Sequence, residues 1–147
     1  MGNLKASVSM ITFNHEKFIA QAIESIMSQQ TSFEFELVIG DDGSTDNTRA
    51  ICEQYQKQFG NKIRLIFNDK NIGSVNNFLQ NIYSCDGDFI AICDGDDFWT
   101  DNSKLQKQVS FLDSHKDYSF CFTNVRSVDA NGKQIKPFTQ IYYNDTF

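Results

Sequence analysis

Three carboxylates stand within four positions of one short stretch of the sequence. FIAICDGDDFW, at residues 89–99, brings Asp94, Asp96 and Asp97 together directly after an apolar run. Like charges about 4 Å apart repel each other by about 1 kcal/mol in water and about 4 kcal/mol at an effective dielectric near 20. A cation would offset that repulsion, because Mg²⁺ and Mn²⁺ prefer oxygen ligands and often share them with substrate phosphates. The three aspartates are therefore candidate ligands of Mn²⁺ or Mg²⁺, and Gly95 lets the backbone turn between them.

Two alternatives to a metal site stay open for this stretch. It could be a solvated acidic turn ahead of a helix that begins near residue 103, because D-x-D occurs often by chance. It also resembles the nucleophile motif of haloacid dehalogenase phosphatases, which depend on Mg²⁺. That motif sits on the first strand and continues to Thr or Val, whereas here it follows the fourth expected strand and continues to Asp97 and Phe98.

A second acidic stretch, DDGSTD at residues 41–46, also follows a buried run. A carboxylate at a strand end can accept hydrogen bonds from a nucleobase or from ribose hydroxyls, so Asp41 and Asp42 are candidates for nucleotide binding. Ser44 and Asp46 suit the cap of the following helix. Capping explains those two residues and leaves the adjacent pair of aspartates unexplained.

Further polar residues follow other expected strands. Thr12, Phe13 and Asn14 end the first strand, where Phe13 could stack on a base or belong to the core. Asn76 and Asn77 open a helix, where they could cap it or contact a ligand.

The two histidines suggest no chemistry of their own. His15 and His115 are expected at the surface or at helix ends. No Ser-His-Asp or Cys-His spacing indicates a nucleophile.

The apolar pattern alternates between strands and helices. Strands are expected at residues 6–10, 35–40, 63–67, 89–93 and 118–128, helices at 15–29, 51–59, 75–82 and 105–112, and a hairpin turn at 130–133. Such alternation implies right-handed crossovers and a mostly parallel sheet. Ligands of these sheets bind beyond the carboxyl ends of the strands, where four of the expected strands end in polar or acidic residues.

Charge and motifs exclude several classes of function. The 147 residues suit one domain, and the net charge of -6 without a basic run argues against nucleic-acid binding. Neither GxGxxG nor GxxxxGK[ST] occurs, which weakens the case for a dinucleotide site or a P-loop. No apolar run approaches the roughly 20 residues of a membrane span, and the start is not a signal peptide. The four cysteines form no CxxC pair and are expected to be buried free thiols. A cytoplasmic protein is expected, at the inner face of a membrane if a further part or partner anchors it.

Taken together, four stretches resemble family 2 glycosyltransferases in order and spacing, over roughly residues 6–125. They are ASVSMITFNHEKFIAQAIESIMSQ, FELVIGDDGSTDNT, NIGSVNN and GDFIAICDGDDFW. The resemblance implies the GT-A fold, a Rossmann-like three-layer α/β/α sandwich with a mostly parallel sheet. It also implies transfer of a sugar from a nucleotide donor, most often UDP-linked, to a carbohydrate or lipid-linked acceptor, with Mn²⁺ or Mg²⁺ and with inversion.

The resemblance assigns the base pocket to the first two strand ends. Thr12 and Phe13 fall where the family has a Thr-Tyr pair that lines this pocket. Asp42 falls where an aspartate contacts uracil, with Asp41 beside it. Ile11 replaces a Pro that is usual in the family, and Phe13 keeps the stacking ring but lacks the Tyr hydroxyl.

The resemblance assigns the diphosphate and the metal to later residues. Gly73 and Asn77 match a Gly and an Asn before the third helix, and Asn76 falls where many members have Arg. The run of residues 94–96 matches the D-x-D motif. The metal ligand would be Asp96 or Asp97, with the other near the ribose.

Residues 1–147 are expected to form one domain, the donor-binding half of a longer enzyme. The acceptor-binding half and the general base would then lie beyond Phe147, which leaves the catalytic residue unknown. A non-catalytic nucleotide-sugar-binding module of the same fold is the main alternative.

Overall fold

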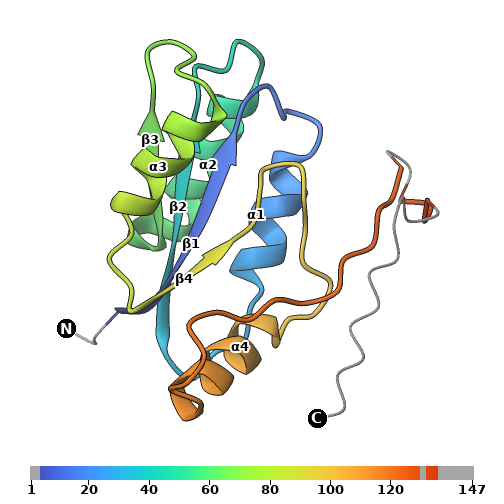
Figure 1. Ribbon diagram of the computed structural model, residues 1–147. Coiled ribbons are helices and arrows are strands. Elements are labelled where there is room, and N and C mark those ends of the chain that lie inside the picture. The colour runs from blue at the N-terminus through green and yellow to red at the C-terminus, as the bar shows by residue number, and fades with distance from the viewer. Residues whose placement is uncertain (1–3, 130–131, 136–147) are drawn as a thin grey trace.

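A computed structural model describes residues 4–129 and 132–135 of the chain (Figure 1). The elements are β1 (Leu4–Thr12), α1 (Ile19–Met27), β2 (Glu34–Asp41), α2 (Thr48–Phe59), the 3-10 helix η1 (Gly60–Lys62), β3 (Ile63–Phe67), α3 (Ser74–Tyr83), β4 (Phe89–Ile92) and α4 (Lys104–Ser114). The four strands form one parallel sheet in the order β3-β2-β1-β4. The predicted alternation of strands and helices and the parallel sheet are confirmed.

One face of the sheet carries the apolar core. Ala6, Val8 and Met10 alternate along β1 and are fully buried. They pack against helical stripes formed by Ile19, Ala22, Ile23 and Ile26 of α1, Cys52 of α2, and Leu105 and Val109 of α4. Burying one large aliphatic side chain stabilises the fold by about 1.5–3 kcal/mol. This cluster therefore holds three helices on one side of the sheet.

The other face is covered by α3, which docks through buried amides. Asn81 Nδ2 donates to the hydroxyl of Ser9 at 2.8 Å and to the carbonyls of Met10 and Val38 at 3.1 and 3.0 Å. A side chain on Gly40 would clash here, because its Cβ would lie 2.9 Å from Asn77 Oδ1 and 3.1 Å from Asn81 Oδ1. The absence of a side chain at Gly40 lets α3 approach the ends of β1 and β2. With α3 on this face, the predicted three-layer α/β/α arrangement is confirmed.

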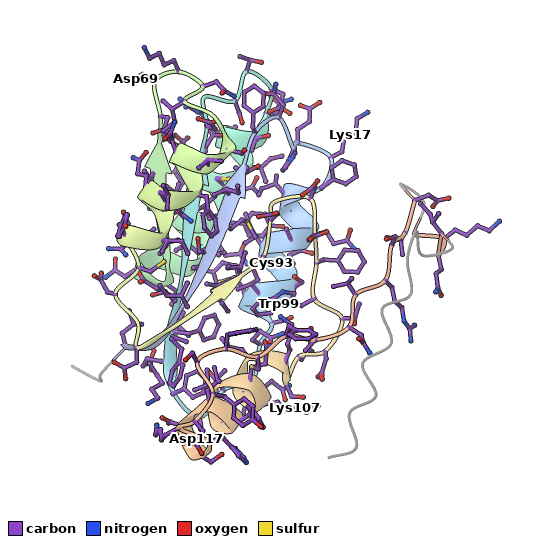
Figure 2. The ribbon with its side chains drawn as sticks, viewed as in Figure 1. Lys17, Asp69, Cys93, Trp99, Lys107 and Asp117 are labelled. Carbon is purple, nitrogen blue, oxygen red and sulfur yellow. The ribbon has the colours of Figure 1, made fainter. Side chains whose placement is uncertain are left out.

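The segment after β4 is anchored beside α1. Cys93 and Trp99 both lie against this helix, as Figure 2 shows. The backbone N–H of Trp99 donates to Ser25 Oγ at 3.0 Å, and Lys104 Nζ lies 3.9 Å from the centre of the indole ring. These contacts fix both ends of the acidic stretch at residues 94–98.

The prediction of a strand at residues 118–128 is wrong. Irregular chain occupies these positions, and Val128 makes only an isolated antiparallel bridge with Gln134. Phe120 and Val125 are 74% and 88% exposed, so the apolar alternation has no sheet to pack on. β propensity depends on such packing, which explains the failure.

The hairpin turn expected at residues 130–133 is only partly described. Residues 130 and 131 lie outside the described residues. The flanking bonds suit a turn, since the N–H of Asp129 donates to the carbonyl of Lys133 at 2.9 Å.

All four cysteines are free thiols, and Cys52 and Cys93 are buried as predicted. Burial raises the pKa of each of these two thiols to about 12. Cys85 and Cys121 are half-buried, so the expectation holds for them only in part. Within the described ranges, no helix is long and apolar enough to cross a membrane.

Candidate functional site

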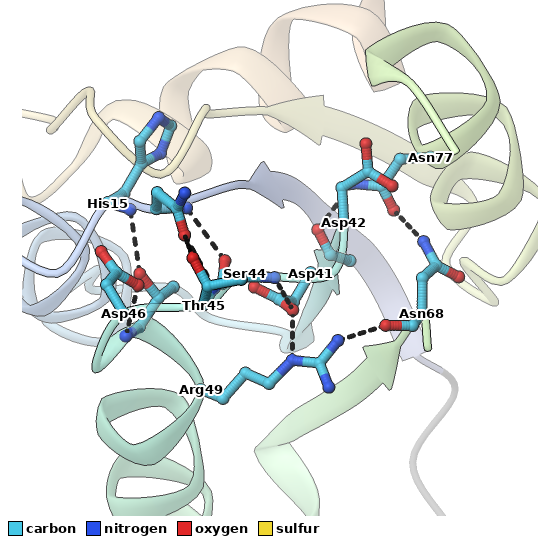
Figure 3. Close-up of polar contacts among 12 residues, drawn as sticks. His15, Asp41, Asp42, Ser44, Thr45, Asp46, Arg49, Asn68 and Asn77 are labelled. Carbon is cyan, nitrogen blue, oxygen red and sulfur yellow. Dashed lines mark hydrogen bonds and ion pairs between the residues drawn. The ribbon is translucent and has the colours of Figure 1, made fainter. Parts of the chain in front are cut away.

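The carboxyl ends of three neighbouring strands lie side by side (Figure 3). The N–H of Asp42 donates to the carbonyl of Thr12, and the N–H of Gly95 donates to the carbonyl of Ile11, both at 2.9 Å. The hydrogen-bonding ladder therefore continues past the ends of the strands. It brings the loops after β1, β2 and β4 to one edge, as the topology predicts.

A pocket of about 340 Å³ opens at this edge. Six of the residues predicted to bind a nucleotide sugar line it, namely Thr12, Phe13, Asp42, Asn77, Asp94 and Asp96. His15, Asn71 and Ser74 line it as well, although the sequence did not single them out as ligand contacts. The other predicted residues, Asn14, Asp41, Gly73, Asn76, Gly95 and Asp97, do not line the pocket.

A larger hollow of about 600 Å³ lies elsewhere, lined by residues 29–35 with Met27 and Lys62. It holds one carboxylate and no cluster of groups that could do chemistry. The pocket at the strand ends is the better candidate, because acidic and aromatic side chains from separate loops meet there.

Asp41 and Asp42 point in different directions. Asp41 is fully buried, and its Oδ1 accepts hydrogen bonds from Ser44 N–H at 3.0 Å and Arg49 Nε at 2.5 Å. Its role in the structure is to hold the loop after β2 and the start of α2. Asp42 lines the pocket, and its two oxygens accept from the N–H groups of Ile72 and Gly73 at 2.7 and 3.0 Å. Of the two, Asp42 is the one placed to meet a ligand.

Asn14 serves the scaffold around the pocket. It has a φ of 56°, a left-handed conformation that turns the chain after β1. Its N–H donates to Ser44 Oγ at 2.9 Å and its Oδ1 accepts from Thr45 N–H at 2.8 Å. These bonds join the loop after β1 to the loop after β2 (Figure 3).

The residues at the start of α3 have two kinds of role: some hold the turn into the helix, and one also borders the pocket. Gly73, with a φ of 89°, is the turn into the helix. Asn76 Nδ2 donates to the carbonyl of Ile72 at 2.7 Å, so this side chain holds the same turn. Asn77 Nδ2 donates to the carbonyl of Gly40 at 2.8 Å and its Oδ1 accepts from Asn68, while the residue also borders the pocket.

The helix caps after β2 are partly as expected. Asp46 Oδ1 accepts from the N–H of Thr48, the first residue of α2, at 3.0 Å, whereas Ser44 bonds to Asn14 instead. Burial acts to raise the pKa of Asp46, but hydrogen bonds from Thr48 and Glu16 outweigh it and lower that pKa.

The carboxylates of Asp94, Asp96 and Asp97 accept no hydrogen bond from any residue that the structure describes. Partial burial raises the pKa of Asp94 above its usual value, and the charges of Asp96 and Asp97 add to the rise. Partial burial and the charge of Asp96 raise the pKa of Asp97 as well. Acidic side chains left without donors and under mutual repulsion are placed to bind a cation.

The fit of a metal ion to this stretch depends on a second ligand. In the described ranges, no three His, Cys, Asp or Glu side chains are grouped closely enough to hold a metal ion by themselves. Mg²⁺ is usually bound by one or two carboxylates together with substrate phosphates, which does not require a protein cage. Asp94 and Asp96, which both line the pocket, fit a cation of that kind.

Thr12 presents an unused polar atom at the pocket. Its side chain is 2% exposed and its Oγ1 is buried without a hydrogen-bond partner. Buried hydroxyls normally have one, so this atom is a candidate hydrogen-bond partner for a ligand of the pocket. Gly95 lies directly against it, because a Cβ at that position would be 2.8 Å from Thr12 Oγ1. A side chain at position 95 would therefore displace Thr12.

Comparison with known proteins gives consistent matches. The family model described as Glycosyl transferase family 2 matches residues 7–146. The putative glycosyltransferase EpsE of Bacillus subtilis is 39% identical over 131 residues, which are 87% of this chain and 45% of that protein. The structure of S. aureus TarS 1-349 in complex with UDP has a TM-score of 0.68 and 30% identity, over 77% of this chain and 33% of that one.

A more distant structure supports the fold alone. The mannosyltransferase PcManGT from Pyrobaculum calidifontis, in complex with GDP-Man and Mn²⁺, has a TM-score of 0.66 at 20% identity, over 75% of this chain and 32% of that one. With these neighbours the GT-A, Rossmann-like fold is confirmed. The chain spans 45% of the length of EpsE and about a third of each of the two solved chains.

Proposed function

Since the chain belongs to glycosyl transferase family 2, we propose that it binds a nucleotide sugar, a UDP-sugar first of all, together with Mn²⁺ or Mg²⁺. The sugar would be transferred, with inversion, to a carbohydrate or lipid-linked acceptor. The phosphatase alternative gains nothing from the comparisons. The setting we propose is the cytoplasm, at the inner face of a membrane where a further part or partner provides an anchor.

One observation carries the proposal. The carboxylates of Asp94 and Asp96, which accept no hydrogen bond from the described residues, lie in the same pocket as Phe13, Thr12 and Asp42. Cation ligands at one side of a pocket and base-binding groups at the other suit a nucleoside diphosphate, which needs both.

The base would bind at the ends of β1 and β2. Phe13 is 40% exposed, so its ring is open to stacking. Asp42 offers the remaining lone pairs of its carboxylate to donors on the base or ribose. Thr12 Oγ1 has no partner and is free to bond to the same ligand.

The diphosphate would lie between α3 and the acidic stretch. α3 begins at Ser74, which lines the pocket, and no side chain caps it. The unsatisfied N–H groups of a helix start attract phosphate. Asp94 and Asp96 would hold the cation on the other side, and a bound cation supplies positive charge to the diphosphate as it leaves.

Calorimetry tests the proposal directly. UDP, GDP and CDP are titrated into the protein with Mn²⁺ and with EDTA. We expect UDP to bind best, and its affinity to fall at least about tenfold, or 1.4 kcal/mol, when EDTA removes the metal. Asp96→Asn should abolish most of the metal dependence, whereas Asp113→Asn, a change on the surface of α4, should preserve it. Equal UDP affinity with and without Mn²⁺ would remove the metal from the proposal.

A further inference from the structure

His15 is held in a fixed place at the rim of the pocket. Its N–H donates to Thr48 Oγ1 at 2.9 Å, which ties it to the start of α2. Its carbonyl accepts from the N–H groups of Phe18 and Ile19, both at 2.9 Å, which ties it to the start of α1. These backbone hydrogen bonds therefore fix the point beside the end of β1 from which the imidazole ring extends.

The two ring nitrogens of His15 have different surroundings. Nδ1 is buried without a hydrogen-bond partner, and it lies so close to Gly95 that a Cβ there would be 3.0 Å away. Nε2 lies 3.9 Å from Asp96 Oδ2. Orphaned buried N–H groups are rarer in proteins than orphaned acceptors, so the proton of the neutral ring belongs on Nε2. Figure 3 shows the ring pointing away from the loop that holds Ser44 and Asp46.

We propose that His15 is a positioning residue for Asp96. In the complex with cation and diphosphate, His15 Nε2–H comes within hydrogen-bond distance of Asp96 Oδ2 and donates to it. The proposal rests on the nucleotide-sugar function above. Nothing else in the described chain donates to that carboxylate, so His15 alone is placed to orient it. Partners that orient a metal ligand typically change metal affinity by about 10–100-fold when they are removed.

Gly95 is part of the same arrangement. Because it has no side chain, both the hydroxyl of Thr12 and the ring of His15 approach the backbone between Asp94 and Asp96. The ring consequently reaches the acidic stretch from the side of β1, across the parallel pair that β1 forms with β4.

The test compares His15→Ala, His15→Gln and the wild type for binding of UDP with Mn²⁺ and with EDTA. We expect His15→Ala to weaken UDP binding about tenfold in Mn²⁺ and to leave it unchanged in EDTA. His15→Gln should stay within about threefold of the wild type, because its amide also donates. His115→Ala is the matched control, since His115 lies at the end of α4 against Phe111, and it should behave as wild type.

Two measurements separate positioning from packing. Thermal denaturation checks that the variants remain folded, and ¹⁵N-edited NMR of the wild type reports the tautomer of His15 without any mutation. We expect the proton on Nε2, with a change at this nitrogen when Mg²⁺ and UDP bind together. Equal losses in Mn²⁺ and EDTA, or a ring with its proton on Nδ1 in the complex, would overturn the role of His15. If the wild type shows no metal-dependent UDP binding, the proposed function itself fails.

Discussion

The carboxylate of Asp42 accepts a hydrogen bond from the backbone N–H of Gly73 at 3.0 Å. Its other oxygen accepts from Ile72 N–H at 2.7 Å, so one side chain at the end of β2 holds the turn into α3. The turn depends on that support, because Gly73 has a φ of 89° and no other bond of its carbonyl or N–H reaches β2. A residue predicted to bind a base therefore also shapes the pocket wall.

Asp42→Asn separates these two roles. The change keeps the size of the side chain but replaces one acceptor oxygen with a donor, so one backbone N–H loses its partner. We expect the free energy of unfolding to fall by about 1–2 kcal/mol in denaturant titrations. UDP binding should weaken more than binding of inorganic diphosphate in the same Mn²⁺ buffer. Equal losses for both ligands would leave Asp42 with only its role in the turn.

Asn81→Ala should be among the most damaging single changes in the chain. Asn81 is fully buried, and its amide donates to Ser9, Met10 and Val38 on two strands. Its removal leaves those acceptors without that donor and opens a cavity under α3. We expect a loss of about 2–4 kcal/mol in the free energy of unfolding, measured by urea denaturation.

Asn76→Ala provides the matched control on the same helix. Asn76 is exposed and donates only to the carbonyl of Ile72. Its loss should cost about 0.5 kcal/mol or less. Similar costs for both variants would mean that the buried amide contacts do not hold α3 in place.

The alternating and helical apolar patterns predicted most of the fold. Ile63, Leu65 and Phe67 mark β3 from its first residue to its last, because alternate residues of this half-buried edge strand share one face of the sheet. The same period failed at residues 118–128, since a strand also needs a neighbour and sequence alone does not reveal one. Asn81 shows a related limit, because a polar residue in a helix gives no sign of the backbone groups it will meet.

The candidate site was predictable where it depended on strand ends. Asp42, Asp94 and Asp96 follow apolar runs, and parallel topology places such residues at one edge. His15 was missed for a physical reason, because its significance depends on which strands are neighbours and on which ring nitrogen is buried. A histidine a few residues after a strand end would be the signal to look for.

Asp94→Asn should stabilise the metal-free protein at neutral pH. The folded-state pKa of Asp94 is raised by burial and by the charges of Asp96 and Asp97. The folded form therefore keeps the Asp94 proton to a higher pH than the unfolded form. Above the folded pKa the carboxylate ionises, and its charge lowers the free energy of unfolding. In EDTA at pH 7 we expect the variant to melt about 1–2 °C higher than the wild type, since solvent screens a half-exposed carboxylate. The difference should shrink towards zero near pH 4.

Asp113→Asn should show the opposite sign. Hydrogen bonds from Lys116 and Lys5 lower the pKa of Asp113, so its charge stabilises the folded form above the unfolded pKa. The variant should melt slightly below the wild type at pH 7, and the difference should vanish as the pH falls through the folded pKa. If Asp94→Asn and Asp113→Asn shifted the melting temperature in the same direction, the result would contradict the inference that the ionised Asp94 destabilises the folded form.

Asp101 is poorly suited to act as the general base for sugar transfer. An inverting reaction needs a base that removes the proton of the acceptor hydroxyl from the face opposite the leaving diphosphate. Asp101, the first carboxylate after the acidic stretch, is bonded to Lys107 at 2.8 Å and to Ser103, and these bonds lower its pKa. A carboxylate of low pKa that is already bonded to a lysine is a weak base.

We therefore expect residues 1–147 alone to bind UDP and metal but to transfer no sugar, whereas a chain as long as the relatives would transfer it. Asp101 is a weak base, the residues span 45% of EpsE and 33% of the TarS chain, and we propose that the base and the acceptor pocket belong to the further part of such a longer chain. The measurement is a screen of radiolabelled UDP-sugars with pooled acceptors, run on both lengths of chain. Binding of UDP by the shorter chain is the control that it is folded. Robust transfer by residues 1–147 would place the base within them, and Asp101→Asn would then be the first variant to assay.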